Sequence, residues 1–243
     1  MQLLVVGAGE MGRWFAGHCG ADAVAFADRD PETARAAAAG FEGARGVSLD
    51  TDERFDVVCL AVPISATPAA IETHAERARG AVVDVSGEMR NAVDALRAHA
   101  AGRERASFHP LFSASNAPGN VPCVTVSAGP TIGRLRSALE AAGNDVFETD
   151  ADTHDDAMET VQATAHTAVL AYALAADDVD PRFHTALSGP LSELVEGLTG
   201  NTPSVYAEIQ ERFEGSAAVA EAAARLADAD GDAFVELYEE AGE

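Results

Sequence analysis

The sequence contains no lysine, because all 16 of its basic residues are arginine, and they face 40 aspartates and glutamates. The formal net charge of −24 repels nucleic acids and anionic membranes, so we expect neither as a partner. The acidic residues are spread along the whole chain, and salt at 1 M would screen their repulsion within about 3 Å. This composition resembles that of extremely halophilic organisms; an acidic mesophilic protein is the alternative.

Cysteine is scarce, and long apolar runs are absent. The three cysteines, Cys19, Cys59 and Cys123, are scattered and odd in number, so they predict neither a disulfide framework nor a metal site. No run of apolar residues approaches the length of about 18 that a membrane-spanning helix needs. The N-terminus lacks the basic segment of a secretory signal. We therefore expect a globular cytoplasmic protein.

The first 150 residues alternate short apolar segments with helical ones. The apolar segments are rich in valine and apolar on both faces, as are strands buried within a parallel sheet. The alternation predicts a doubly wound, mostly parallel α/β domain of Rossmann type over residues 1–150. The expected strands are Leu3–Val6, Ala23–Ala27, Val57–Val62, Ala81–Val85, Ser107–His109, Cys123–Val126 and Asp145–Phe147, and the clearest expected helices are Pro31–Ala39 and Asn91–Ala101.

The strand pattern stops after Asp150. Residues 151–243 predict a smaller all-helical domain, with prolines and glycines where helices should end. The expected helices are Thr153–Ala176, Pro181–Leu198, Pro203–Phe213, Ser216–Ala227 and Asp232–Glu240.

A glycine motif, Gly7-Ala8-Gly9-Glu10-Met11-Gly12, follows the first expected strand and opens a helix. Gly7 permits a tight turn, Gly9 lets the backbone approach a pyrophosphate, and Gly12 lets helix and strand pack closely. The pyrophosphate would bind the N–H groups at the helix start. The motif predicts dinucleotide binding; a glycine turn that binds no nucleotide is the alternative.

Asp28 ends the second expected strand, about 20 residues after the motif, where a carboxylate accepts hydrogen bonds from a ribose 2′-hydroxyl. It would repel a 2′-phosphate, which favours NAD, although the neighbouring Arg29 keeps NADP possible. The turn Ala61-Val62-Pro63 ends another strand and should border the cofactor, since ligands bind at the carboxyl ends of such strands.

Histidines mark a second candidate site. His109 ends an apolar strand on the edge that binds ligands, where an imidazole can act as an acid or a base or have only a structural role. We expect His18, His74 and His99 to be solvated on polar helix faces. Four more residues recur every fourth position and would form one stripe of a helix, either as a site or as core contacts: His154, Met158, Gln162 and His166.

Taken together, these motifs resemble the prephenate dehydrogenases, a group that includes the arogenate dehydrogenases. The resemblance extends from Met1 to about Gln210. It rests on Gly7–Gly12, Ala61-Val62-Pro63, Asp84-Val85-Ser86, His109-Pro110-Leu111-Phe112, the run from His154 to His166, and Asn201–Ile209.

The resemblance implies an NAD-dependent oxidoreductase of tyrosine and aromatic amino acid biosynthesis that converts prephenate to 4-hydroxyphenylpyruvate and CO2. It implies that His109 draws the proton from the ring hydroxyl, while His166 and Gln162 line the substrate pocket and His154 lies at its mouth. It also implies a small anionic substrate, and it assigns substrate binding and the formation of a homodimer to the helical domain of residues 151–243.

Three departures from the family pattern bear on these roles. The segment after Asp84 lacks the usual lysine, and Ser86 or Gly87 stands where a serine helps to orient the catalytic histidine. Ser113-Ala114 replaces a usual Gly-Pro. The arginine for the side-chain carboxylate is replaced by Gly189, so Arg182 is our candidate anchor. An imine or hydroxyacid reductase and a silent dinucleotide sensor are the other hypotheses.

Overall fold

The computed structural model describes residues 1–242 and divides into two compact units. The first comprises Met1–Asp155, and the second begins at Asp156. The assignment of residues 1–150 to dinucleotide binding and of residues 151–243 to substrate binding and dimerisation stays a prediction.

One sheet of eight strands organises the first unit, in the order β3-β2-β1-β4-β5-β6-β7-β8. All neighbouring strands are parallel except β6 and β7, which are antiparallel, so the predicted mostly parallel, doubly wound class is confirmed. The strands are β1 (Gln2–Val6), β2 (Ala23–Ala27), β3 (Arg45–Gly46), β4 (Phe55–Leu60), β5 (Ala78–Asp84), β6 (Glu104–Phe108), β7 (Asn120–Ser127) and β8 (Asp145–Glu148).

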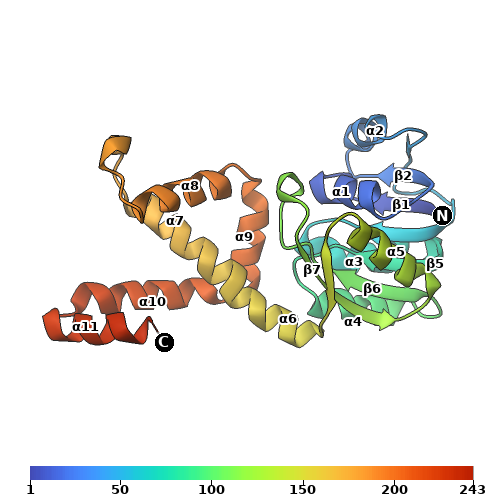
Figure 1. Ribbon diagram of the computed structural model, residues 1–243. Coiled ribbons are helices and arrows are strands. Elements are labelled where there is room, and N and C mark those ends of the chain that lie inside the picture. Colours follow the sequence, from blue (N-terminus) through green and yellow to red (C-terminus); the bar gives the residue numbers. More distant parts are fainter. Residues whose placement is uncertain (243) are drawn as a thin grey trace. The chain divides into compact units, whose positions relative to one another are not determined.

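Helices cover both faces of this sheet (Figure 1). Successive strand residues point to opposite faces, so Leu3 and Val5 belong to one core, and Leu4 and Val6 to the other. The first core is covered by α1 (Glu10–His18), α2 (Pro31–Ala39) and α5 (Pro130–Ala141), and the second by α3 (Thr67–His74) and α4 (Arg90–His99).

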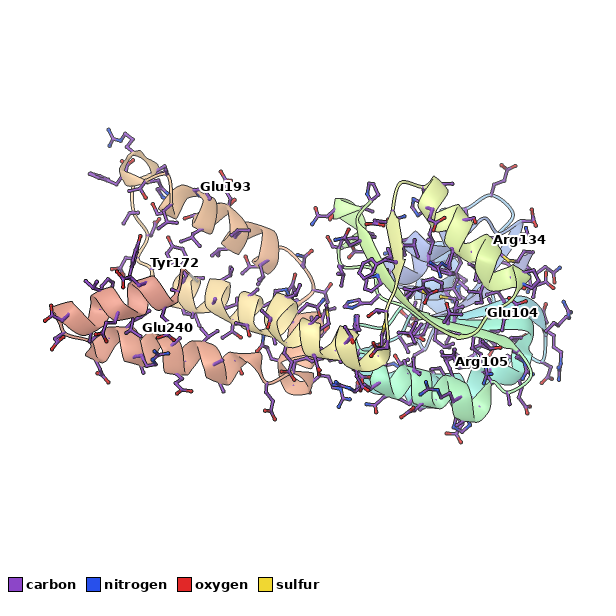
Figure 2. The ribbon with its side chains drawn as sticks, turned by 60° about the horizontal axis from the view of Figure 1, so that its bottom comes forward. Glu104, Arg105, Arg134, Tyr172, Glu193 and Glu240 are labelled. Atoms are coloured by element: carbon purple, nitrogen blue, oxygen red, sulfur yellow. The ribbon has the colours of Figure 1, made fainter. Side chains whose placement is uncertain are left out.

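Glu104, which Figure 2 labels on β6, fastens α5 to the sheet. Its carboxylate accepts hydrogen bonds from the Thr131 hydroxyl at 3.0 Å and from the Ile132 N–H at 2.8 Å. Carboxylates are favourable at a helix N-terminus because the first N–H groups there have no partner within the helix. A side chain from a strand thus caps the helix packed on it.

The second unit contains only helical elements among its described residues, as predicted. An ion pair between Arg225 and Glu240 joins two of them, and Figure 2 labels Glu240. No described helix is long and apolar enough to cross a membrane. The elements are the end of α6 (Ala151–Met158), a π-helical turn (Glu159–Thr164), α7 (Ala165–Ala175), a 3₁₀ turn (Pro181–Phe183), α8 (Ser188–Thr199), α9 (Pro203–Arg212), α10 (Gly215–Asp228) and α11 (Gly231–Glu240).

Two predicted helices differ in detail from the structure. The stretch Thr153–Ala176 is interrupted by the π-helical turn, where the Thr164 hydroxyl donates to the carbonyl of Glu159 at 2.8 Å. The stretch Pro181–Leu198 is a 3₁₀ turn followed by α8, which starts only at Ser188. Side-chain hydrogen bonds to backbone groups compete with the regular helix in both places. In the second place, the Thr185 hydroxyl accepts a hydrogen bond from the Ser188 N–H at 3.1 Å.

The expectation that His74 is solvated was also wrong. Its side chain lies at the end of α3, is buried, and forms a hydrogen bond with the guanidinium of Arg77. Burial, and next the charge of Arg77, lower the pKa of His74 to about 4. His18 and His99 are exposed, as predicted.

Candidate active site

The glycine motif forms the turn between β1 and α1, and it approaches the end of β4 closely. Gly7 has φ +95°, and a Cβ atom there would lie 2.2 Å from the carbonyl oxygen of Ala61. A Cβ at Gly12 would lie 2.1 Å from the oxygen of Gly7, whereas one at Gly9 would meet nothing within 4 Å. Two glycines therefore permit close packing, and Gly9 leaves open space at the start of the helix.

That open space lies at the N-terminus of α1. Gly9 caps the helix without a side chain, so the first N–H groups face outward and provide the usual site for a phosphate. Glu10 reaches away from the turn, and its carboxylate accepts a hydrogen bond from the Ala114 N–H at 2.7 Å. Met11 is half-buried against the core. These features fit a bound dinucleotide pyrophosphate.

Asp28 follows β2 and lies beside the glycine turn. Its two carboxylate oxygens accept hydrogen bonds from the N–H groups of Ala8 at 2.8 Å and Asp30 at 3.0 Å. The side chain is half-buried, and each oxygen retains a second lone pair for a ligand hydroxyl. Arg29, next to it, is exposed. The geometry suits an adenosine ribose held at this position.

The end of β4 continues this border. Ala61 and Val62 are half-buried, and the carbonyl of Pro63 accepts hydrogen bonds from the Ala66 N–H at 2.9 Å and the Thr67 hydroxyl at 3.1 Å. These bonds start a short 3₁₀ turn, Ile64–Ala66, ahead of α3. The chain is therefore turned sharply at the carboxyl edge of the sheet.

A buried polar cluster occupies the end of the neighbouring strand β5. Asp84 is fully buried, and its Oδ1 accepts hydrogen bonds from the Ser107 hydroxyl at 2.9 Å and the Ser86 N–H at 3.1 Å. Its Oδ2 is buried without a hydrogen-bond partner in the described part of the chain. Burial raises the pKa of Asp84 to about 7. Ser86 is buried, and its hydroxyl accepts from the Glu88 N–H at 3.4 Å.

His109 follows β6 directly and is bonded to a second histidine. Its Nδ1 lies 2.9 Å from Nε2 of His154, with the two rings edge to face. Nδ1 of His154 lies in turn 2.7 Å from Oδ1 of Asp155. All three side chains are buried. Helix α6 places His154 in the first unit, and its predicted position at the mouth of a substrate pocket stays a prediction.

The pKa values of His109 and Asp155 are shifted by different causes. Burial, and next the neighbouring His154, lower the pKa of His109 to about 3, so the ring is neutral at ordinary pH. Burial alone would raise the pKa of Asp155, but hydrogen bonds from His154 and from the N–H groups of Met89 and Arg90 lower it below its usual value. An ionised Asp155 carboxylate therefore lies at one end of the three side chains, and a neutral His109 at the other.

The remaining predicted residues lie in the second unit. Gln162 is half-buried in the π-helical turn. His166, on α7, packs edge to face on Tyr206 with ring centroids 4.9 Å apart, and its Nδ1 is buried without a hydrogen-bond partner in the described chain. Burial lowers the pKa of His166. Arg182 is 86% exposed and pairs with Asp180 at 2.6 Å.

Sequence reasoning missed the contribution of Asp155 and Asp84. Asp155 stands directly after His154, and adjacent residues of a helix normally point in different directions. Its role depends on the backbone amides at 89 and 90, which the sequence does not place near it. Asp84 ends an apolar strand, and that position was a usable signal for a polar group at the ligand-bearing edge.

Comparisons with known proteins agree with this geometry. A family model described as "Prephenate dehydrogenase, nucleotide-binding domain" matches residues 11–121. The 4-amino-4-deoxyprephenate dehydrogenase of Streptomyces pristinaespiralis is 31% identical over 247 residues, covering 92% of this chain and 81% of the relative.

Solved structures share the fold at low sequence identity. Prephenate dehydrogenase from Aquifex aeolicus, in complex with hydroxyphenyl propionate and NAD⁺, superposes with a TM-score of 0.69 at 16% identity, over 100% of this chain and 96% of that one. Synechocystis arogenate dehydrogenase gives a TM-score of 0.60 at 16% identity, over 100% and 98%.

Proposed function

Because the chain belongs to the prephenate dehydrogenase family, we propose that this NAD-dependent dehydrogenase oxidises prephenate to 4-hydroxyphenylpyruvate and CO2, in the cytoplasmic synthesis of tyrosine. One observation carries the proposal most strongly. His109, a buried neutral imidazole, follows a strand of the same sheet whose carboxyl edge bears the glycine turn. A proton acceptor and a nucleotide site therefore share one edge.

The glycine turn and the start of α1 would hold the pyrophosphate, and Asp28 would bind the ribose hydroxyls. Ala61, Val62 and Pro63 would line the nicotinamide side. NAD⁺ supplies the hydride acceptor when bound. Because Asp28 is a carboxylate beside this position, it favours NAD over NADP, whose 2′-phosphate it would repel.

His109 would accept the proton of the ring hydroxyl, which builds negative charge as the ring carbon is oxidised. Ser86 is held at the end of β5, and its backbone N–H is fixed by Asp84. As in the family pattern, Ser86 would help to orient His109. Gln162 and His166 would bind the substrate, and Arg182 would pair with its side-chain carboxylate by releasing Asp180.

A related substrate is the second candidate, because the relative from Streptomyces pristinaespiralis is named for 4-amino-4-deoxyprephenate. This compound carries an amine where prephenate carries the ring hydroxyl. A neutral His109 can accept a hydrogen bond from either group. Arogenate, which differs in the side chain instead, is the other alternative.

A substrate panel tests the proposal. The values of kcat/KM for NAD⁺ reduction should be measured with prephenate, arogenate and 4-amino-4-deoxyprephenate, at both low and high salt. We expect prephenate to have the highest value by tenfold or more. A higher kcat/KM for 4-amino-4-deoxyprephenate would identify that compound as the substrate. The absence of turnover with all three compounds would refute an oxidoreductase of this class.

We also propose a homodimer formed through the helical unit. Helix α7 is rich in alanine and leucine, yet none of its residues is buried. Exposed apolar side chains gather on this unit, with exposed fractions of 89% for Leu174, 77% for Phe183 and 73% for Leu187. Apolar surface of this kind is typical of an interface. One chain has a mass of 25.1 kDa, and light scattering after size-exclusion chromatography should give twice that mass.

A further inference from the structure

His109 is the first member of a chain of three polar side chains in the first unit. The contacts run from His109 Nδ1 to His154 Nε2 at 2.9 Å, and from His154 Nδ1 to Asp155 Oδ1 at 2.7 Å. All three side chains are 6% exposed or less. Water therefore has little access to the chain, and its hydrogen bonds determine where the protons lie.

Asp155 sets the direction of these bonds. Its carboxylate accepts hydrogen bonds from the backbone N–H groups of Met89 at 2.9 Å and Arg90 at 3.0 Å, and the Arg90 guanidinium lies 4.0 Å away. An ionised carboxylate only accepts, so Nδ1 of His154 must donate to it. In the neutral ring, the lone pair of His154 is then at Nε2.

The direction passes on to His109. Since His154 presents a lone pair at Nε2, Nδ1 of His109 must donate, and the lone pair of His109 is at Nε2. That nitrogen lies on the side of Gly87, where a Cβ atom would be 3.6 Å from it. The base of His109 is thus directed by a carboxylate two side chains away.

We propose that Asp155 and His154 are positioning residues, which hold His109 in the tautomer that accepts the substrate proton and then store that proton. The proton step rests on the proposed function. In it the substrate O–H bond breaks and an Nε2–H bond forms on His109, while the Nδ1–H bond of His109 breaks and an Nε2–H bond forms on His154. The positive charge comes to lie on His154, next to Asp155.

The reaction needs a group that holds the substrate proton temporarily. Oxidation and loss of CO2 convert the cyclohexadienol to a phenol, which again carries a hydroxyl proton, so the borrowed proton must return. Burial disfavours a charge on His109, as its lowered pKa indicates. A charge on His154 is instead 2.7 Å from a carboxylate. Reversal of both transfers restores the resting state.

The first test needs no substrate. Long-range ¹H–¹⁵N spectra of the full chain with labelled histidines report which ring nitrogen carries each proton. At pH 7.5, His109 and His154 should both appear as Nδ1–H tautomers. An Nε2–H signal from His109 would overturn the proposal, whatever the substrate, so its failure is distinct from that of the proposed function.

The second test compares matched variants. Asp155→Asn should lower kcat by about 100-fold, the range of a mispositioned general base, while leaving KM for prephenate and the Kd for NAD⁺ within threefold. Asp152→Asn removes an exposed carboxylate of the same helix that pairs with Arg90, and it should keep kcat. A folded Asp155→Asn with normal kcat overturns the proposal.

Variants of His154 separate positioning from proton storage. In His154→Gln, the amide oxygen can still accept from Nδ1 of His109, but the side chain cannot take up a proton. His154→Leu removes both roles. We expect the glutamine variant to retain at least tenfold more kcat than the leucine variant, and to keep the Nδ1–H signal of His109. Equal kcat in the two, or loss of that signal in the glutamine variant, contradicts the assignment. If Asp155→Asn does not fold, the wild-type spectrum decides alone.

Discussion

At the scale of single residues, Asp84 makes the stability of the first unit depend on pH. Its pKa is raised by burial to about 7, whereas in the unfolded chain it is near 3.8. A group whose pKa is higher in the folded state stabilises the fold in acid, and this contribution is lost as the pH rises from about 4 to about 7. The wild-type protein therefore buries a charge at pH 8 that it does not bury at pH 4.

Asp84→Asn should remove this dependence, because its amide oxygen can still accept from Ser107 and Ser86. The free energy of unfolding of the variant, relative to wild type, should rise between pH 4 and pH 7 by up to about 4 kcal/mol and then level off. Chemical denaturation across this range measures it. Asp145→Asn, which neutralises an exposed carboxylate, is the control, and a flat difference for both variants would show that Asp84 titrates normally.

Asp28 should set the choice of cofactor. Asp28→Ser removes the negative charge next to the ribose while leaving an oxygen that can accept from the Ala8 N–H. The ratio of kcat/KM for NAD to that for NADP should fall by about tenfold, the loss of one charged contact. Arg29→Ala should move the ratio the other way. Equal use of both cofactors by the wild-type enzyme would contradict this role.

At the scale of elements, the π-helical turn depends on a close approach by α10. A Cβ atom at Gly215 would lie 2.5 Å from the oxygen of Glu159 and from the nitrogen of Thr164. Gly215→Ala should therefore lower the free energy of unfolding by about 1–3 kcal/mol, as overpacking does. Thermal or urea unfolding measures the change.

Gly197→Ala is the matched control for that variant. It lies within α8, and a Cβ there would meet nothing within 4 Å. Since alanine is the better helix former, this change should stabilise by up to about 1 kcal/mol. If both alanine variants behave alike, the tight contact at Gly215 does not support the turn.

The elements also show how far the sequence could be interpreted. The strand Ala23–Ala27 and the helix Pro31–Ala39 were predicted with the bounds that the structure gives, because their patterns are local. The two-residue strand β3 was not foreseen, since so short a segment has no pattern. The π-helical turn was missed because it depends on Gly215, which is distant in the sequence.

The candidate site likewise contains parts that the sequence could predict and parts that it could not. Its glycine turn, Asp28 and His109 could be predicted from motifs that follow strands. The bonding of His154 to His109, and of Asp155 to two backbone amides, could not be predicted, because these contacts join segments about 45 and 65 residues apart. The roles of these residues stay predictions until they are measured.

At the scale of the whole molecule, the charge of −24 should make the fold depend on salt. At low ionic strength the acidic side chains repel one another, and 1 M salt shortens the range of that repulsion to about 3 Å. The melting temperature should therefore rise steadily between 0.1 and 2 M KCl, by about 10 °C or more, because salt weakens the repulsion that destabilises the folded state. An unchanged melting temperature would refute the halophilic interpretation.

The central claim is that His109 is the base of an NAD-dependent oxidation at the carboxyl edge of the sheet. The most direct measurement is absorbance at 340 nm with NAD⁺ and prephenate, for the wild type and for His109→Asn, together with the Kd of each for NAD⁺. We predict a fall in kcat of about 10²–10⁴-fold with little change in that Kd, since the cofactor would bind backbone N–H groups that the substitution leaves intact. Unchanged turnover in His109→Asn would contradict the account.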